Sequence, residues 1–317
     1  MLRRGVVPLG FAFLMVVAAC GGGTTAAPPA TTQTLAVPAN VASALAPLPD
    51  DTCSLLQGPS CPFDADNFSN PTVITNQWHP LTPGTELVFE GTTNEDNELL
   101  EHRVVITVTD LVKVIDGIPS VVAYDQDFST GELAEKEIAF FAQDDDGNLW
   151  RMGEHPEEYD GGRFVEAPTW LAGIGGAKAG IAMLGSPDVG TLSYAQGFST
   201  AVEFMDRAQV QQLEEETCVA YGCFSDVLVI GEFSVEEPGA RQLKFFASGI
   251  GNIRVDWGGA DETQEELELV SFRQLSRAEL AEIREAALAL EAHAYRISPD
   301  VYGLSEPIRT TGGSGSA

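Results

Sequence analysis

Basic residues are scarce in this chain of 317 residues. Lysine and arginine together number 17, against 47 aspartate and glutamate residues, so the formal net charge at pH 7 is −30. A surface this acidic repels nucleic acid and anionic lipid headgroups, and it attracts cations and basic partners. The sequence therefore predicts no nucleic-acid partner, and the simplest role of the charge is to keep the protein soluble.

Recognisable catalytic and cofactor motifs are also missing. The chain has no Gly-x-Ser-x-Gly elbow, no phosphate-binding loop and no dinucleotide fingerprint after a strand. No two of the four histidines have the spacing of metal ligands; they are His79, His102, His155 and His293. Because no nucleophile–base set is visible, the sequence predicts no cofactor and favours a protein that is not an enzyme.

The N-terminal apolar stretch is too short to span a membrane. Val6–Val17 follows two arginines and leads to Ala18-Ala19-Cys20, whereas a spanning helix needs about 20 apolar residues. A charged start, an apolar stretch and small residues form a secretory signal with its cleavage site. With a cysteine directly after that site, the segment resembles the lipobox of bacterial lipoproteins.

This resemblance implies that residues 1–19 are a signal peptide and that Cys20 carries the lipid, with palmitate-type acyl chains. Loss of residues 1–19 removes two arginines and no acid, which takes the net charge from −30 to −32. The protein is then expected on the outer face of the cell membrane, or in the periplasm where an outer membrane is present.

The remaining four cysteines form two close pairs, Cys53/Cys61 and Cys218/Cys223. An exported location permits disulfides, and local pairing is the simplest of the three connectivities. We predict Cys53–Cys61 and Cys218–Cys223 bonds, each contributing about 2–3 kcal/mol through chain entropy. Zinc binding is the alternative, but no histidine lies near either pair.

Composition divides the exported chain into three parts. Residues 20–49 carry no charge and are rich in glycine, threonine, alanine and proline, which predicts a disordered tether. Residues 50–297 are expected to form a single β-rich domain, and residues 298–317 an extended or disordered tail. No sequence feature indicates an oligomer, so we expect a monomer.

Alternating residues predict a mainly β fold. Residues 104–109 alternate with period two and are β-branched, and an Asp-Gly turn joins Ile138–Phe141 to Leu149–Met152 as a hairpin. Short connections and no long alternating helices favour an antiparallel meander forming a curved sheet, half-barrel or barrel. Further predicted strands are 86–90, 120–127, 163–166, 192–197, 201–211, 227–233, 241–247, 252–257 and 265–273.

One long helix is predicted over residues 276–296. Ser276 and Glu279 form a capping box, and Ser298-Pro299 follows the last helical residues. The apolar stripe of this helix is narrow and rich in alanine. We therefore expect it to pack on the sheet.

Several turn and core motifs resemble an uncharacterised family of exported bacterial β-rich lipoproteins. The opening motif is Pro80–Gly84 and the closing motif is Phe245–Gly251, with a central hairpin at Phe140–Trp150 and a later turn at Tyr221-Gly222. The resemblance covers residues 70–272. It implies the fold and the export of the protein. It says little about an activity, because members of the family are mostly of unknown function.

Acidic residues gather between positions 154 and 160. Glu154, Glu157, Glu158 and Asp160 could form a calcium site, since Ca²⁺ prefers oxygen ligands, or a pair of catalytic carboxyls of the glycosidase type. The simplest interpretation is an exposed acidic loop between strands.

These features favour a binding module for an amphiphile or a cell-envelope partner, tethered to the membrane through its lipid. The alternatives are a glycosidase-like hydrolase that uses acidic residues and a calcium-stabilised surface protein. A continuous apolar inner face would favour an amphiphile, whereas two carboxylates about 5–10 Å apart in a cleft would favour a hydrolase.

Overall fold

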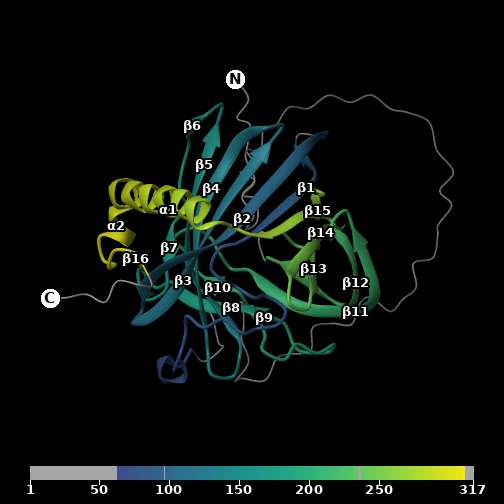
Figure 1. Ribbon diagram of the computed structural model, residues 1–317, viewed down its shortest axis with the longest axis horizontal. Coiled ribbons are helices and arrows are strands. Elements are labelled where there is room, and N and C mark those ends of the chain that lie inside the picture. Colours follow the sequence, from purple (N-terminus) through teal and green to yellow (C-terminus); the bar gives the residue numbers. More distant parts are fainter. Residues whose placement is uncertain (1–62, 96, 235–236, 311–317) are drawn as a thin grey trace, which may run out of the picture.

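The computed structural model describes residues 63–95, 97–234 and 237–310. They form one large antiparallel sheet that curves strongly on itself, with a long helix near the C-terminus (Figure 1). The predicted mainly antiparallel β fold is confirmed, and the sheet is curved without closing into a barrel. The predicted signal peptide, Cys20, the tether and the Cys53/Cys61 pair lie outside the described residues.

Strand order divides the sheet into two halves that meet where β1 pairs with β15. The first half contains β1 (Thr85–Glu95), β2 (Glu98–Ile115), β3 (Ile118–Ser129), β4 (Glu132–Gln143), β5 (Leu149–Asp160) and β8 (Lys178–Met183). The second half contains β11 (Arg207–Val219), β12 (Gly222–Phe233), β13 (Ala240–Ala247), β14 (Gly251–Gly259) and β15 (Glu266–Gln274). The shortest strands are β6 (Arg163–Phe164), β7 (Trp170–Leu171), β9 (Tyr194–Ala195), β10 (Gly197–Phe198) and β16 (Arg309–Thr310).

Both ends of the sheet are made by one short length of chain. β10 pairs with β8 at one end, and β9 pairs with β11 at the other. Gln196 alone separates these two strands in the sequence. The pairing of β9 covers only Arg207 and Ala208 of β11, and the rest of this outermost strand pairs only with β12 among the described residues.

The predicted capping box starts the long helix α1 (Arg277–Ile297). The Ser276 hydroxyl accepts the Glu279 N–H at 3.3 Å, and the Ser276 N–H donates to the Glu279 carboxylate at 2.8 Å. Ala287, Leu290 and Ala294 are buried on its sheet-facing side. None of the helices within the described ranges is long and apolar enough to span a membrane.

A buried ion pair ties α1 to β2. The Lys113 side chain is fully buried, and its Nζ donates to Glu291 Oε1 at 2.8 Å and to the Glu306 carbonyl at 2.6 Å. The Ile308 N–H donates to the same Glu291 carboxylate at 3.0 Å. These bonds hold the helix and the chain after it on one face of the sheet.

Part of the predicted tail has regular structure. Pro299–Tyr302 form the short helix α2, in which the Tyr302 side chain is buried, and β16 pairs with Leu111 and Val112 of β2. The extended segment therefore does not begin at residue 298, because buried contacts continue to β16. Residues 311–317 lie outside the described residues.

Candidate functional site

Two rows of carboxyl groups lie side by side on the inner face of the first half. In one row Asp127 pairs with Glu135, which in turn pairs with Glu158; in the other, Asp125 pairs with Glu137. Directly paired residues of an antiparallel ladder have side chains on the same face, about 5 Å apart. We call these the Glu135 row and the Glu137 row.

Register identifies this face as the one opposite α1. Glu157 of β5 contacts His293 of α1, so the alternate positions Glu154 and Glu158 face the other way. Lys244 of β13 acts electrostatically on both Asp125 and Glu137, although it belongs to the second half of the sheet. The carboxyl rows therefore lie on the concave face, between the two halves.

Most of these carboxyls retain a proton near neutral pH. Burial, the largest cause, and nearby Glu154 raise the pKa of Asp125, Arg151 and Lys244 lower it, and the net result is a pKa of about 7. Burial followed by neighbouring carboxylates raises the pKa of Glu135 and Glu137 well above the ordinary value. Burial and Glu166 raise the pKa of Glu158 to about 7. Like charges placed side by side cannot all ionise in a low-dielectric site.

Several oxygens of the rows have no hydrogen-bond partner. The residue Glu135 is 2% exposed and the residue Asp127 is 3% exposed. Glu135 Oε2, Asp127 Oδ2 and Asp125 Oδ1 are buried without a partner. An unsatisfied buried acceptor costs about 1–3 kcal/mol, so the native state retains unmet hydrogen-bonding capacity at this place.

Two basic side chains, Arg151 and Lys244, act on the carboxyls of the concave face. Arg151 Nη1 donates to Glu154 Oε2 at 2.8 Å, and Lys244 Nζ lies 2.6 Å from Glu232 Oε2. Burial alone would raise the pKa of Glu232, but Lys244, Gln196 and Arg151 together lower it below the ordinary value. These ion pairs engage Arg151 with Glu154 and Lys244 with Glu232, so neither base is paired with a carboxyl of the Glu135 row.

His102 of β2 is the only basic group that contacts the Glu135 row among the described residues. Its Nε2 lies 2.6 Å from Asp127 Oδ1, and its Nδ1 lies 3.1 Å from Glu265 Oε1. Burial alone would lower the pKa of His102, but hydrogen bonds and charge from these two carboxylates raise it to about 10. The charge of this imidazolium is thus already shared between two acids.

His79, directly before the predicted opening motif, packs between the two halves of the sheet. Its ring lies 5.9 Å from the Phe141 ring and 5.8 Å from the Phe246 ring. Burial, followed by the charges of Lys244 and Arg151, lowers its pKa to about 4. His79 is therefore neutral and acts as a packing residue.

A second polar cluster lies on the opposite face, beneath the C-terminal helices. Glu157 accepts hydrogen bonds from His293 and Tyr159, both at 2.5 Å, and its Oε1 lies 3.2 Å from His155 Nε2. His155 Nδ1 lies 2.5 Å from the Thr169 hydroxyl. Thr169, His155 and Glu157 are arranged like a nucleophile, base and acid, but all three are buried and their polar atoms are engaged in hydrogen bonds with one another and with α1. The cluster fastens α1 to β5.

The interpretation of residues 154–160 as an exposed acidic loop is wrong. These residues belong to β5, a central strand in which Glu154, Glu157 and Glu158 are buried. Glu154 and Glu158 face the concave side, Glu157 faces α1, and Asp160 is exposed at the end of the strand. The four do not converge, and the described residues contain no group of three or more potential ligands arranged for a metal ion.

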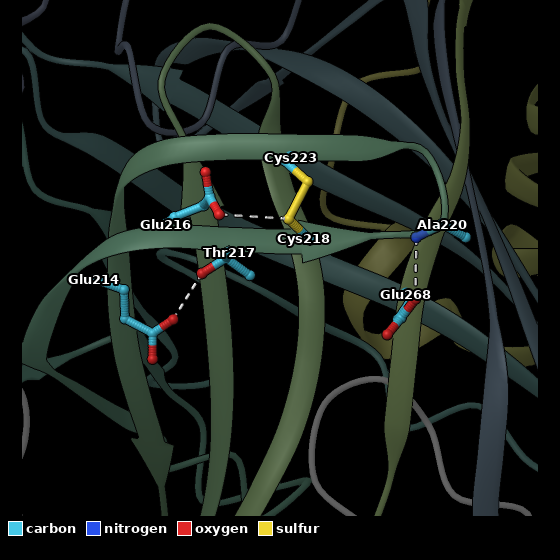
Figure 2. Close-up of a disulfide and its surroundings, with 7 residues drawn as sticks. All are labelled: Glu214, Glu216, Thr217, Cys218, Ala220, Cys223 and Glu268. Atoms are coloured by element: carbon cyan, nitrogen blue, oxygen red, sulfur yellow. Dashed lines mark hydrogen bonds between the residues drawn. A yellow bond between two sulfur atoms is a disulfide. The ribbon is translucent and has the colours of Figure 1, made fainter.

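The Cys218–Cys223 disulfide is present at the tip of the β11–β12 hairpin (Figure 2). The tip docks on β15, because the Ala220 N–H donates to the Glu268 carboxylate at 3.0 Å and the Tyr221 N–H to the Leu269 carbonyl at 2.9 Å. The disulfide closes the turn that makes these contacts.

An open hollow of about 320 Å³ lies beside this tip, lined by residues of β1, β14 and β15. Arg254 in its lining lies against Asp256, 2.5 Å away. The hollow therefore offers no unpaired basic group for an anion.

Sequence reasoning missed the residues that form the concave site. It named Glu154 and Glu158 but none of Asp125, Asp127, Glu135 and Glu137. Acids at alternate positions of two consecutive strands, 125/127 and 135/137, were the available signal, because alternate residues share a face.

Comparisons with known proteins find distant likenesses only. No family model matches the chain, and no curated protein matches it. A solved structure from Bacteroides fragilis, assigned as an exported protein with a YmcC-like fold, has a TM-score of 0.38 and 12% identity, covering 63% of this chain and 100% of that chain. One from Parabacteroides distasonis, assigned as a lipoprotein, has a TM-score of 0.37 and 12% identity, covering 62% of this chain and 99% of that chain. Likenesses this distant identify neither the family nor the function of this chain.

Proposed function

We propose that the protein is an exported, lipid-anchored binding module that holds a polar ligand on the concave face of its sheet. The observation that carries this proposal is the set of buried carboxyl oxygens without partners at Glu135, Asp127 and Asp125. Polar groups buried without partners are costly and concentrate where a ligand or ordered water completes their hydrogen bonds. Strand pairing places these groups from neighbouring strands on one face of the curved sheet.

The chemistry of this face favours a polar ligand over an acyl chain. Asp125, Glu137 and Arg151 occupy the centre of the first half, where an apolar chain would have to cover charged and polar groups. An amphiphile would therefore be held by its headgroup. A polar component of the cell envelope would likewise place polar groups against these side chains.

The proposal is tested by thermal unfolding of the full-length protein in non-ionic detergent against a panel of envelope headgroups, sugars and amines. We expect at least one compound to raise the melting temperature of the wild type and of Glu282→Gln, whose side chain is exposed on α1. The same compound should not stabilise Glu137→Gln. Stabilisation that is equal in all three proteins would place binding away from the concave face.

Lipid anchoring is tested separately at Cys20, the residue after the predicted cleavage site. Labelling with a fatty acid in the native cell should mark the wild type and leave Cys20→Ser unmarked. Equal labelling of both proteins would contradict the lipobox prediction.

A glycosidase-like hydrolase is the second candidate, and one observation favours it. Asp125 has a pKa of about 7, suited to a general acid at neutral pH, and Glu154 beside it is paired with Arg151. Hydrolysis of cell-envelope glycans by the wild type, lost in both Asp125→Asn and Glu154→Gln, would establish this activity. Binding of a glycan without its hydrolysis would support the proposed binding module.

A further inference from the structure

We propose that the Glu135 row binds an organic ammonium ion. This inference rests on the proposed function and names the chemical class of the ligand for that same face. Asp127, Glu135 and Glu158 are brought together from β3, β4 and β5 by strand pairing, and two of the three have a buried oxygen without a partner.

The charges around the row are strongly unbalanced. The carboxyls that act on it come from six segments of the chain: Glu95, Asp127, Glu135, Glu137, Glu154, Glu158, Glu166 and Glu265. His102 is the one base that contacts it within the described ranges, and it lies between Asp127 and Glu265. Lys136, the neighbour of Glu135, points to the other face and lies over the Tyr159 ring. A cation bound at Glu135 Oε2 and Asp127 Oδ2 meets several carboxyls and leaves in place the contacts of His102 with Asp127 Oδ1 and Glu265 Oε1.

The unmet hydrogen bonds indicate a donor-rich cation. An ammonium group has three N–H donors and no acceptor, so it can bind three separate carboxyls at once. A guanidinium is a planar fork that suits one coplanar carboxylate, which the three-strand row does not present. A metal ion requires several converging ligands, and the described residues hold no group arranged for one.

A second amine can be accommodated by the Glu137 row. Asp125 and Glu137 lie two residues along their strands from Asp127 and Glu135, and two strand residues span about 7 Å. A diamine with a four-carbon spacer can place one nitrogen at each row. Arg151 and Lys244 lie on the far side of the Glu137 row and limit the site to two amines.

Binding of such a cation should release protons. Glu158 has a pKa of about 7 and Glu135 a pKa well above the ordinary value, both through burial first, so the free site is largely protonated. A cation stabilises the ionised carboxyls, and the affinity therefore rises with pH. For one proton released from a group that titrates near pH 7, the affinity rises about tenfold between pH 6 and pH 8.

The test is titration calorimetry of the full-length protein in non-ionic detergent with 1,4-diaminobutane at constant ionic strength. We expect saturable binding that tightens about tenfold from pH 6 to pH 8. Buffers of different ionisation heat should give different apparent heats, because protons are released. 1-Aminobutane should bind more weakly, since it fills one row only.

Glu135→Gln should weaken binding at least about tenfold, because it removes the central carboxylate. Glu282→Gln is the matched control, since it removes the same charge from the exposed surface of α1. Circular dichroism confirms that Glu135→Gln folds, which we expect because the substitution removes a buried acid.

Three results would overturn the inference: no saturable binding by folded wild type, binding with no proton release, or equal losses in Glu135→Gln and Glu282→Gln. The last would mean that the acidic surface in general attracts the diamine. Stabilisation by a neutral sugar that depends on Glu137, together with no diamine binding, would leave the binding module standing and reject only the ammonium ligand.

Discussion

At the scale of single residues, His102 is a buried base held by two carboxylates. It is held between Asp127 and Glu265, and these carboxylates raise its pKa from 6.5 to about 10. A histidine whose folded pKa is raised contributes stability that is complete below its unfolded pKa. That contribution disappears as the pH rises from about 6.5 to about 10.

We predict that His102→Gln destabilises the protein by about 3–5 kcal/mol at pH 6, because it leaves two buried carboxylates without their cation. The difference from the wild type should shrink steadily toward pH 10. Urea unfolding of both proteins across this range measures it. A difference that does not change with pH would show that His102 is neutral in the folded state.

At the scale of elements, a buried ion pair is one of the contacts that attach α1 to the sheet. Lys113 and Glu291 are joined across the interface, and Glu291 also accepts the Ile308 N–H that precedes β16. Removing one partner of a buried pair leaves an uncompensated charge, whereas replacing both with apolar side chains does not.

Lys113→Met should therefore cost about 3–5 kcal/mol of unfolding free energy, and Lys113→Met with Glu291→Leu should cost less than Lys113→Met alone. A double-mutant cycle by chemical denaturation gives the coupling. Additive losses would indicate that the pair contributes no net interaction.

The β11–β12 hairpin tip gives a second prediction at this scale. Replacing Cys218 and Cys223 by serine should cost about 2 kcal/mol, because the closed loop is short. The tip should remain docked through the Ala220 and Tyr221 bonds to β15. Unfolding of the variant and of the wild type is compared without and with a reducing agent. We expect the variant to be less stable only without the reducing agent, because reduction breaks the same bond in the wild type. Cys53 and Cys61 are the same in both proteins, so they do not contribute to the difference.

At the scale of the whole molecule, the buried carboxyls determine how stability depends on pH. Burial is the largest cause of the raised pKa at Asp125, Glu158, Glu135, Glu137 and Asp206. The folded state therefore binds more protons than the unfolded state above about pH 4, so stability falls as the pH rises through 7. The lowered pKa values of His155 and Glu157 act in the opposite direction, mainly below pH 6.5.

We predict a melting temperature lower at pH 8.5 than at pH 5.5 by roughly 5–10 °C, since a domain of this size loses about 2–4 °C per kcal/mol. Glu135→Gln with Glu137→Gln should reduce that difference. Scanning calorimetry at fixed ionic strength measures both. A melting temperature that rises with pH would mean that these carboxyls are ionised in the folded protein.

Local patterns predicted strands rich in β-branched residues, such as residues 104–109 in β2, and the capping box of α1. They failed where acids are buried. Residues 154–160 look like a loop because Glu154, Glu157 and Glu158 place carboxyls on both faces of β5. Strand register brings the two rows together, and register depends on distant partners that a local pattern does not reveal.

Strand β11, which only the two-residue strand β9 follows in the strand order, presents an edge that a second copy of the chain could approach. Beyond Ala208 its outer edge has no strand partner among the described residues, and the run Glu214-Glu215-Glu216 lies along that edge. A strand added from a second molecule would bring identical glutamates into the growing seam. Charge on an exposed edge discourages such addition, so we expect concentrated protein to resist fibre formation at neutral pH and to lose that resistance when these carboxyls are neutralised.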